Sequence, residues 1–229
     1  DVLTEDTADL VLTMILMICR KVRNAQQKLT NEKWTGWGPS ETIGERISGK
    51  KIGIIGMGRI GLAVAKRCFS LGIEISYHNR KKLKSNIEKK CNAKYWNNLD
   101  EMLAYVDIVS IHCPYTPETF HLLSKKRLKL LKKKAIVVNT SRGEIIDENE
   151  LANLLLKKKI GGVGLDVFEH EPQVTPNLLE ADNAVLLPHI SSATTECRVS
   201  MGIRVFKNID FFQKGMSPPD LIKENLSKN

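Results

Sequence analysis

The stretch KKIGIIGMGRIGLAVAKRCFSLGIEISYHNR, residues 50–80, decides the fold of this chain. It begins with an apolar run rich in isoleucine, passes through the glycine turn GMGRIG at residues 56–61, and continues in a helical pattern. A second apolar run at residues 73–77 completes strand, turn, helix and strand within about 30 residues. This βαβ arrangement is the context in which a glycine turn binds a dinucleotide.

Each glycine of the turn has a separate role in such a unit. Gly56 permits the tight turn, Gly58 lets the backbone approach a pyrophosphate, and Gly61 allows the helix to pack closely on the strand. The amino end of the helix adds unpaired N–H groups that bind an anion. We therefore predict a dinucleotide site here in preference to ordinary turn glycines.

The residues after the second strand indicate which dinucleotide is bound. NAD sites carry Asp or Glu about 20 residues beyond the glycines for the ribose 2′-hydroxyl, whereas NADP sites place Arg nearby. Here Asn79 stands in the place of the acid, and Arg80 and Lys81 follow it. The alternative is a solvated basic turn in a lysine-rich chain. The missing carboxylate and the added cations favour NADP(H), while NAD(H) remains possible.

Length and composition are those of a soluble globular protein. The chain has 229 residues, of which 42% are apolar and 27% charged, enough for one large or two small domains. Its net charge of +9 could indicate a nucleic acid partner, but the lysines are scattered, so we expect a solvated surface and no nucleic acid. The longest apolar run, residues 10–19, is too short to span a bilayer, and no signal peptide precedes it.

The cysteines predict a reducing environment. They are five in number, far apart, and show neither CxxC nor metal-ligand spacing. We expect reduced thiols, no metal site, no membrane association and a cytoplasmic location. The chain begins at Asp1 without an initiator methionine, which suggests a fragment.

Strands and helices alternate through the rest of the chain. This alternation predicts an α/β fold with a doubly wound parallel sheet of Rossmann type, whose ligands bind beyond the carboxyl ends of the strands. We assign residues 50–190 to this dinucleotide-binding domain, and residues 191–229 to a C-terminal helix, at about 193–213, and a tail. The further strands are predicted at residues 107–113, 135–139, 162–167 and 185–187.

The segment before the glycine turn is predicted to contact other parts of a larger assembly. A helix is predicted from Thr4, as a capping hydroxyl, to about Leu29. Residues 10–18 are apolar nearly all round, as at a domain or subunit interface. Trp34 and Trp37 follow in a polar arm, where either the core or a partner subunit could bury them. We assign residues 1–49 to an interdomain helix and dimerisation arm, and expect a homodimer.

Polar side chains follow the last three predicted strands, on the side where the cofactor should lie. Arg142 follows residues 135–139, Asp166 and Glu171 follow the next strand, and His189 follows the last. Taken singly, Arg142 could be a surface cation, Glu171 a solvated acid and His189 a capping or core histidine. Together they supply an acid/base histidine, a carboxylate that orients it and a guanidinium for an α-keto acid, beside a hydride donor.

These residues lie in motifs that resemble the D-isomer-specific 2-hydroxyacid dehydrogenases, especially their NADPH-using glyoxylate/hydroxypyruvate reductase branch. The motifs are TEDTAD at 4–9, GMGRIG at 56–61, CPYTPET at 113–119, VNTSRGEIID at 138–147, GLDVFEHEP at 164–172 and LPHISSAT at 187–194. The resemblance implies reduction of a small 2-keto acid to the D-2-hydroxy acid. Arg142 would bind the substrate carboxylate and carbonyl, and Glu171 would pair with His189, the proton donor.

The resemblance also implies the residues that line the cofactor. Asp166 would meet the nicotinamide carboxamide, and small or backbone groups would line the rest of the site. The implied set, besides the three glycines and residues 79–81, is Arg59, Ile60, Cys113, Pro114, Thr119, Thr140, Ser141, Asp166 and Ser191.

One departure from the family concerns the amino end. The family carries a segment before the helix at Thr4 that forms most of its substrate domain, and this segment is absent here. The resemblance therefore implies a coenzyme domain with remnant helices of a split substrate domain, and weak or no activity for this chain alone.

Other functions remain open at this point. The C-terminal-binding-protein corepressors resemble the same fold, which leaves a non-catalytic, dinucleotide-sensing module as an alternative that a preference for NADH would favour. A phosphoglycerate dehydrogenase-like enzyme would be expected to prefer NAD. A formate dehydrogenase would carry Gln where Glu171 stands.

Overall fold

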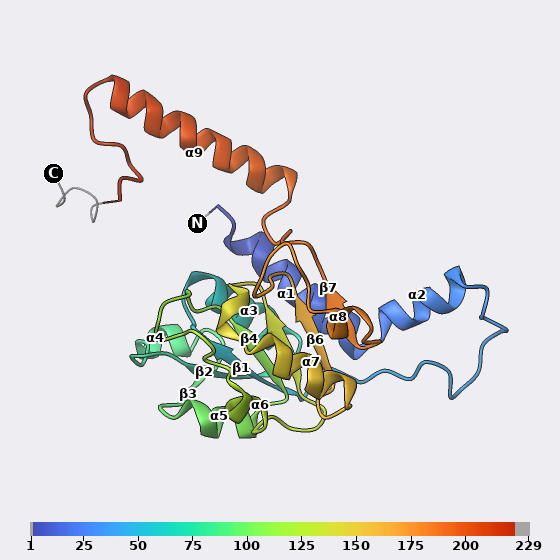
Figure 1. Ribbon diagram of the computed structural model, residues 1–229. Helices are drawn as coiled ribbons and strands as arrows, with labels where there is room; N and C mark the ends of the chain where they lie inside the picture. The colour runs from blue at the N-terminus through green and yellow to red at the C-terminus, as the bar shows by residue number, and fades with distance from the viewer. Residues whose placement is uncertain (1, 223–229) are drawn as a thin grey trace.

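A parallel sheet between two layers of helices forms the body of the computed structural model, which describes residues 2–222 (Figure 1). Within these residues the strands pair in the order β3-β2-β1-β4-β5-β6-β7, and every pairing is parallel. The order reverses between β1 and β4, which places the ligand crevice of such a sheet at their carboxyl ends. The strands are β1 Lys51–Ile55, β2 Glu74–His78, β3 Lys94–Tyr95, β4 Ile108–Ile111, β5 Ile136–Asn139, β6 Gly162–Leu165 and β7 Ala184–Leu186.

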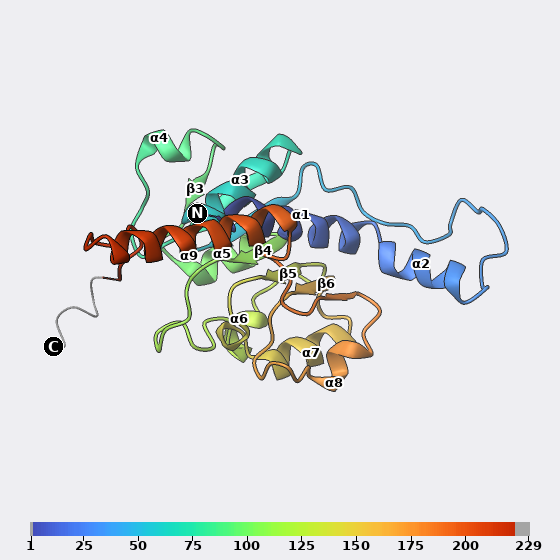
Figure 2. The same cartoon turned by 90° about the horizontal axis from the view of Figure 1, so that it is seen from above.

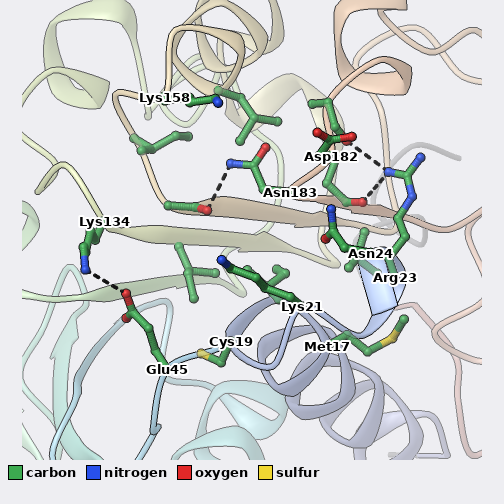
Figure 3. Close-up of a pocket in the computed structure, with 18 of the residues that line it drawn as sticks. Met17, Cys19, Lys21, Arg23, Asn24, Glu45, Lys134, Lys158, Asp182 and Asn183 are labelled. Carbon is green, nitrogen blue, oxygen red and sulfur yellow. Dashed lines mark hydrogen bonds and ion pairs between the residues drawn. The ribbon is translucent and has the colours of Figure 1, made fainter. Parts of the chain in front are cut away.

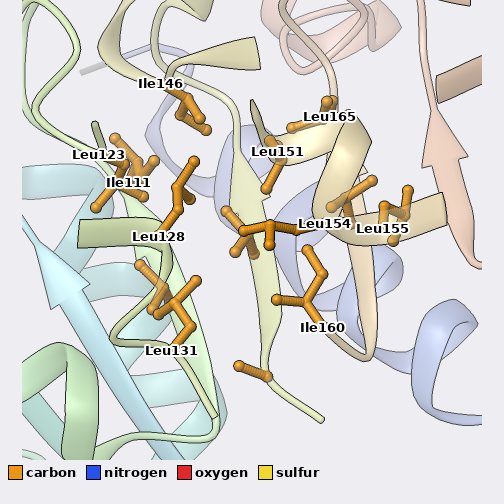
Figure 4. Close-up of a cluster of buried hydrophobic side chains, with 14 of the residues drawn as sticks. Ile111, Leu123, Leu128, Leu131, Ile146, Leu151, Leu154, Leu155, Ile160 and Leu165 are labelled. Atoms are coloured by element: carbon orange, nitrogen blue, oxygen red, sulfur yellow. The ribbon is translucent and has the colours of Figure 1, made fainter. Parts of the chain in front are cut away.

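The helices divide between the two faces of the sheet (Figure 2). Side chains of α1 and α3 pack with alternate strand residues on one face, while α5 to α8 pack on the other, as Figure 4 shows for Leu151, Leu154 and Leu155 of α7. Successive strand residues point to opposite faces, so a central strand covered on both sides has to be apolar throughout. The helices are α1 Thr4–Cys19, α2 Val22–Thr30, α3 Arg59–Ser70, α4 Ser85–Glu88, α5 Leu99–Tyr105, α6 Lys125–Leu128, α7 Glu148–Leu156, α8 Pro176–Leu179, α9 Thr195–Gln213 and the short 3-10 helix Gly143–Ile145.

The predicted α/β fold and its strand positions are confirmed to within two residues at each end. Strand β3 was not predicted, because two residues are too few to show an alternating pattern. The predicted boundary at residue 191 is not tested by this fold, and residues 223–229 of the last segment lie outside the described residues.

The prediction of one helix from Thr4 to about Leu29 is wrong. The chain forms two helices, and Lys21 between them adopts a left-handed backbone with φ of 50°. Apolar residues that pack on the sheet end at Cys19, and the polar residues of α2 bury none of their side chains. Arg23 instead donates to the carbonyl oxygens of Ala181 and Ala184, at 3.1 and 2.7 Å. Thr4 is not the cap, since Leu3 precedes the helix without a side-chain hydrogen bond.

Two parts of the chain extend away from the body (Figure 1). One is α2 with the arm that follows it, where Trp34 is 58% and Trp37 86% exposed. The protein core therefore does not bury these tryptophans. The other is α9, whose Phe206 and Phe212 are also largely exposed.

No helix among residues 2–222 is both long enough and apolar enough to cross a bilayer.

His112, just after β4, gives the fold a dependence on pH. Burial lowers the pKa of His112 from 6.5 to about 4, and its Nε2 lies 2.7 Å from Ser110 Oγ. The unfolded chain therefore takes up a proton as the pH falls below 6.5, whereas the folded chain does so only near pH 4. Between pH 6.5 and pH 4 we therefore expect the free energy of unfolding to decrease as the pH is lowered, by about 1.4 kcal/mol per pH unit.

Urea unfolding at a series of pH values measures this dependence. His112→Asn removes the titrating group. In the upper part of this pH range, the free energy of unfolding should therefore change less with pH in this variant than in the unmodified chain. Equal slopes in the two proteins would show that His112 does not titrate as the structure indicates.

Candidate active site

The glycine turn lies at the carboxyl end of β1, beside the carboxyl end of β4. Gly56 has a φ of +91°, and a Cβ there would lie 2.6 Å from the backbone N of Cys113. A Cβ on Gly61 would lie 2.5 Å from the carbonyl oxygen of Gly56. A Cβ on Gly58, by contrast, would have no atom within 4 Å. Gly56 and Gly61 are thus required by the close packing of the chain itself, whereas the backbone at Gly58 has space beside it for a ligand.

The surroundings of the turn fit a bound dinucleotide. Helix α3 begins at Arg59, directly after the turn, so its first N–H groups face this edge of the sheet. Thr140, after β5, carries a buried hydroxyl oxygen that has no hydrogen-bond partner among the described residues. A buried polar atom without a partner costs free energy that a bound ligand could recover.

Asn79 has a contact that the sequence did not indicate. Its Oδ1 accepts a hydrogen bond of 2.7 Å from the backbone N of Met57, in the middle of the glycine turn. Arg80 and Lys81 follow as exposed residues. Asn79 therefore ties the end of β2 to the glycine turn, and it leaves the two cations beside the turn.

The loop after β4 carries three of the predicted cofactor residues, Cys113, Pro114 and Thr119. The hydroxyl of Thr119 donates to the carbonyl oxygen of Pro114 at 2.8 Å and accepts from the backbone N of Thr116 at 2.7 Å. Ser141, from the loop after β5, donates its hydroxyl to the carbonyl oxygen of Cys113. These hydroxyls shape and join the two loops, which places the predicted residues around one edge of the sheet.

Asp166 is fully buried at the end of β6 and holds the loop that carries His189. One carboxylate oxygen accepts from the backbone N of Ile190 at 2.7 Å, and the other from the backbone N of Ser191 at 2.8 Å. Its contact with a nicotinamide carboxamide stays a prediction. The structure shows that both of its oxygens already bind backbone N–H groups.

His189 and Glu171, predicted as a pair, lie within hydrogen-bonding distance. His189 Nδ1 is 2.9 Å from Glu171 Oε2, and Glu171 Oε1 accepts from the backbone N of Phe168 at 3.1 Å. Partial burial raises the pKa of Glu171, but the hydrogen bonds from His189 and Phe168 and the charges of His189 and Arg142 outweigh it and lower that pKa. The carboxylate is thus an acceptor, so His189 Nδ1 carries the proton and Nε2 is left for a reacting group.

Arg142 lies on the exposed surface of the same edge. Its Nη1 donates to the carbonyl oxygen of Ser141 at 2.6 Å, and its charge contributes to lowering the pKa of Glu171. Asn139 shapes the turn that carries it, because Asn139 Nδ2 donates to the carbonyl oxygen of Arg142 at 2.8 Å and Oδ1 accepts from the backbone N of Ser141 at 2.9 Å. Sequence reasoning missed Asn139, although a buried asparagine ending an apolar strand was a usable signal.

A cavity of about 670 Å³ lies elsewhere, at the opposite edge of the sheet (Figure 3). It is lined by Ile136 and Ala184, at the amino ends of β5 and β7, and by Lys21, which lies between α1 and α2. Lys134 in its wall pairs with Glu45 at 3.1 Å. This cavity is therefore separate from the loops that carry Arg142, Glu171 and His189.

Known proteins are similar to this chain in both sequence and fold. Residues 12–191 match the family model described as D-isomer specific 2-hydroxyacid dehydrogenase, NAD binding domain. The chain is 41% identical to a glyoxylate reductase from Thermococcus litoralis over 98% of this chain and 69% of that protein.

Two similar proteins have been solved with both a nicotinamide dinucleotide and a small organic acid bound. An NADPH-dependent glyoxylate/hydroxypyruvate reductase from Sinorhizobium meliloti, in complex with NADP and malonate, superposes with a TM-score of 0.84 at 34% identity, covering 93% of this chain and 65% of that one. A D-lactate dehydrogenase from Aquifex aeolicus, complexed with NAD and lactic acid, does so with a TM-score of 0.83 at 28% identity, covering 93% and 67%.

The matches and the geometry lead to the same class of protein. The relatives are enzymes, which favours an enzyme over the dinucleotide-sensing module. The glycine turn, the open backbone at Gly58 and the family match identify the cofactor as a nicotinamide dinucleotide. The chain belongs to the D-isomer-specific 2-hydroxyacid dehydrogenase family of oxidoreductases.

Proposed function

We propose that this chain is the coenzyme-binding part of an NADPH-dependent reductase that converts a small 2-keto acid, such as glyoxylate or hydroxypyruvate, into the D-2-hydroxy acid. The observation that carries the proposal is the 2.9 Å pair of His189 and Glu171, which is close to the charge of Arg142 and lies at the same carboxyl end of the sheet as the glycine turn. The names of the relatives, glyoxylate reductase and glyoxylate/hydroxypyruvate reductase, support the substrate class.

Each of the three residues has a distinct part in the proposed reaction. Arg142 binds the substrate carboxylate and carbonyl oxygen through its guanidinium fork and fixes the orientation of the keto acid. His189 gives a proton to the carbonyl oxygen from Nε2 as negative charge develops there. Glu171 accepts from Nδ1, holds the imidazole in one tautomer and stabilises its charged form. The nicotinamide, when bound, supplies the hydride.

The preference for NADPH rests on residues 79–81. Relatives of known structure use both cofactors, since one binds NADP and another NAD. Here the side chain at the end of β2 is the neutral amide of Asn79, which binds the glycine turn, and Arg80 and Lys81 are exposed next to it. A ribose 2′-phosphate would gain two cations at this position, whereas NADH would find no carboxylate for its 2′-hydroxyl.

Exchanging these residues should change the cofactor preference. Asn79→Asp keeps an oxygen for the Met57 N–H and adds a carboxylate, and Arg80→Ala removes a cation. We expect the pair of substitutions to shift the preference toward NADH by at least tenfold, about 1.4 kcal/mol. Calorimetric titration with NADPH and NADH measures the shift.

Lys82→Ala is the matched control, because it removes a charge that pairs with Glu88 at 3.8 Å. It should leave the preference unchanged. Equal or tighter binding of NADH by the unmodified chain would contradict the NADPH assignment.

Catalysis should depend on the His189 and Glu171 pair and on Arg142. In a chain extended by the upstream segment that the family resemblance implies, His189→Ala should lower turnover by roughly a hundredfold. Glu171→Gln removes the charge that favours protonated imidazole, so turnover should fall increasingly as the pH rises. Arg142→Lys should severely weaken use of the keto acid, because an ammonium cannot form the bidentate contact. Steady-state rates across pH measure all three.

The unextended 229-residue chain provides the comparison. It should bind NADPH yet reduce glyoxylate poorly, since Arg142 and His189 are exposed to water within the described residues. Full turnover by this chain, or wild-type turnover by the extended His189→Ala enzyme, would show that the proton donor or the extent of the catalytic unit is misassigned.

We also propose that the chain forms a homodimer through α1 and the arm that carries Trp34 and Trp37. Both tryptophans are exposed, as are Leu29 of α2 at 59% and Ile43 at 61%, so α2 and the arm offer apolar surface that a second copy could cover. Light scattering at micromolar concentration should report a dimer, and Trp37→Ser should weaken it. A monomer under these conditions would contradict the proposal.

A further inference from the structure

His121 and Glu169 form a second histidine–carboxylate pair that the proposed reaction does not use. His121 lies between β4 and α6, and Glu169 lies two residues before Glu171. His121 Nε2 is 2.7 Å from Glu169 Oε1. The side chain of Glu169 is only 12% exposed, and that of His121 is 30% exposed. A contact this short between half-buried groups fixes the position of both chain segments.

His121 also binds the segment that carries Arg142. Its backbone N donates to the carbonyl oxygen of Glu144 at 2.8 Å, two residues beyond Arg142. The backbone N of Leu123 continues this pairing with the carbonyl oxygen of Ile145 at 3.0 Å. One residue therefore joins the Arg142 segment, through its backbone, to the Glu171 segment, through its ring.

Glu169 is held from its other side by Glu148, at the start of α7. The backbone N of Glu169 donates to Glu148 Oε2 at 2.8 Å, and the backbone N of Glu148 lies 3.4 Å from Glu169 Oε2. Glu148 Oε1 accepts from both the backbone N and the hydroxyl of Thr175, at 3.2 and 2.6 Å. The loop 169–175 is thus anchored at both ends, with Glu171 between the anchors.

The segments of Arg142 and Glu171 also touch directly. A Cβ added to Gly143 would lie 1.9 Å from the carbonyl carbon of Phe168, whose backbone N in turn donates to Glu171. There is no room for one segment to move toward the other. The position of Glu171 relative to Arg142 is therefore set by this backbone contact and by the bonds of His121, Glu169 and Glu148.

We propose that His121 and Glu169 are positioning residues that hold Glu171 in contact with His189 and at its distance from Arg142. The inference rests on the proposed function, in which Glu171 orients His189. Loss of the His121–Glu169 contact frees the start of loop 169–175. A displacement of about 1 Å there is enough to weaken the contact between Glu171 and His189 substantially. The pair itself touches neither substrate nor cofactor in this assignment.

The tautomer of the His189 ring in the 229-residue chain tests this positioning, and measuring it requires no catalytic turnover. Well above neutral pH, where imidazoles are neutral, the 15N shifts of the His189 ring distinguish the two tautomers. The Glu171 contact holds the proton on Nδ1, whereas free histidine populates both forms. Glu171→Ala, which has no acceptor for Nδ1–H, supplies the spectrum of the lost contact.

A matched pair of variants tests His121. It adopts a left-handed backbone with φ of 44°, which Asn tolerates, and the shorter amide of His121→Asn falls short of Glu169. We expect the His189 shifts of this variant to move toward those of Glu171→Ala. His121→Gln, with an amide long enough to reach Glu169, should restore the unmodified shifts. His170→Asn, at an exposed histidine of the same loop, is the control and should leave them unchanged.

Glu169→Ala provides the second route if His121→Asn does not fold. It removes both carboxylate oxygens, which contact His121 Nε2 and the backbone N of Glu148, so the same movement of the His189 shifts is expected. Folded variants of both residues with unmodified His189 shifts would overturn the proposal. NADPH binding should stay within about threefold in the His121, Glu169 and His170 variants. If the unmodified chain does not bind NADPH, the proposed function is refuted, whereas the His189 shifts still test the positioning proposal.

Discussion

The close approach of two backbones, at Gly56 and Cys113, is the constraint on which the rest of this structure depends. A side chain at Gly56 would collide with the Cys113 backbone, so β1 and β4 can lie side by side at the switch point only because residue 56 is glycine. The same contact places the loop after β4 beside the turn that opens α3. Every predicted cofactor residue then gathers at one edge of the sheet, because parallel strands end together.

Carboxylates organise the other half of this edge. Asp166 accepts two backbone N–H groups from the His189 loop, Glu171 accepts one from Phe168, and Glu148 accepts from both Glu169 and Thr175. The backbone N–H groups of the loops after β6 and β7 thus find their acceptors in these acids, which hold the loops in place. The lowered pKa of Glu171 follows from the same arrangement, since its donors favour the charged form despite partial burial.

Packing within the chain covers the apolar side chains of the sheet but leaves those of the arm and of α9 exposed. The sheet has helices on both faces and an apolar core on each. The arm with Trp34 and Trp37 and the helix α9 lie outside this core and expose large apolar side chains. For the arm, this exposed apolar surface is the physical basis for proposing contacts with a second copy of the chain.

The sequence by itself determined the fold class, the strands and the residues at the strand ends, because glycine spacing and apolar periodicity are local properties of the chain. The family resemblance also implied that Glu171 pairs with His189, and the structure places them 2.9 Å apart. The break at Lys21, the bond from Asn79 to Met57 and the anchoring of the Glu171 loop through His121 and Glu148 were decided by the tertiary structure. Each depends on contacts with segments that are distant in the sequence, and those contacts are set only after the sheet has assembled.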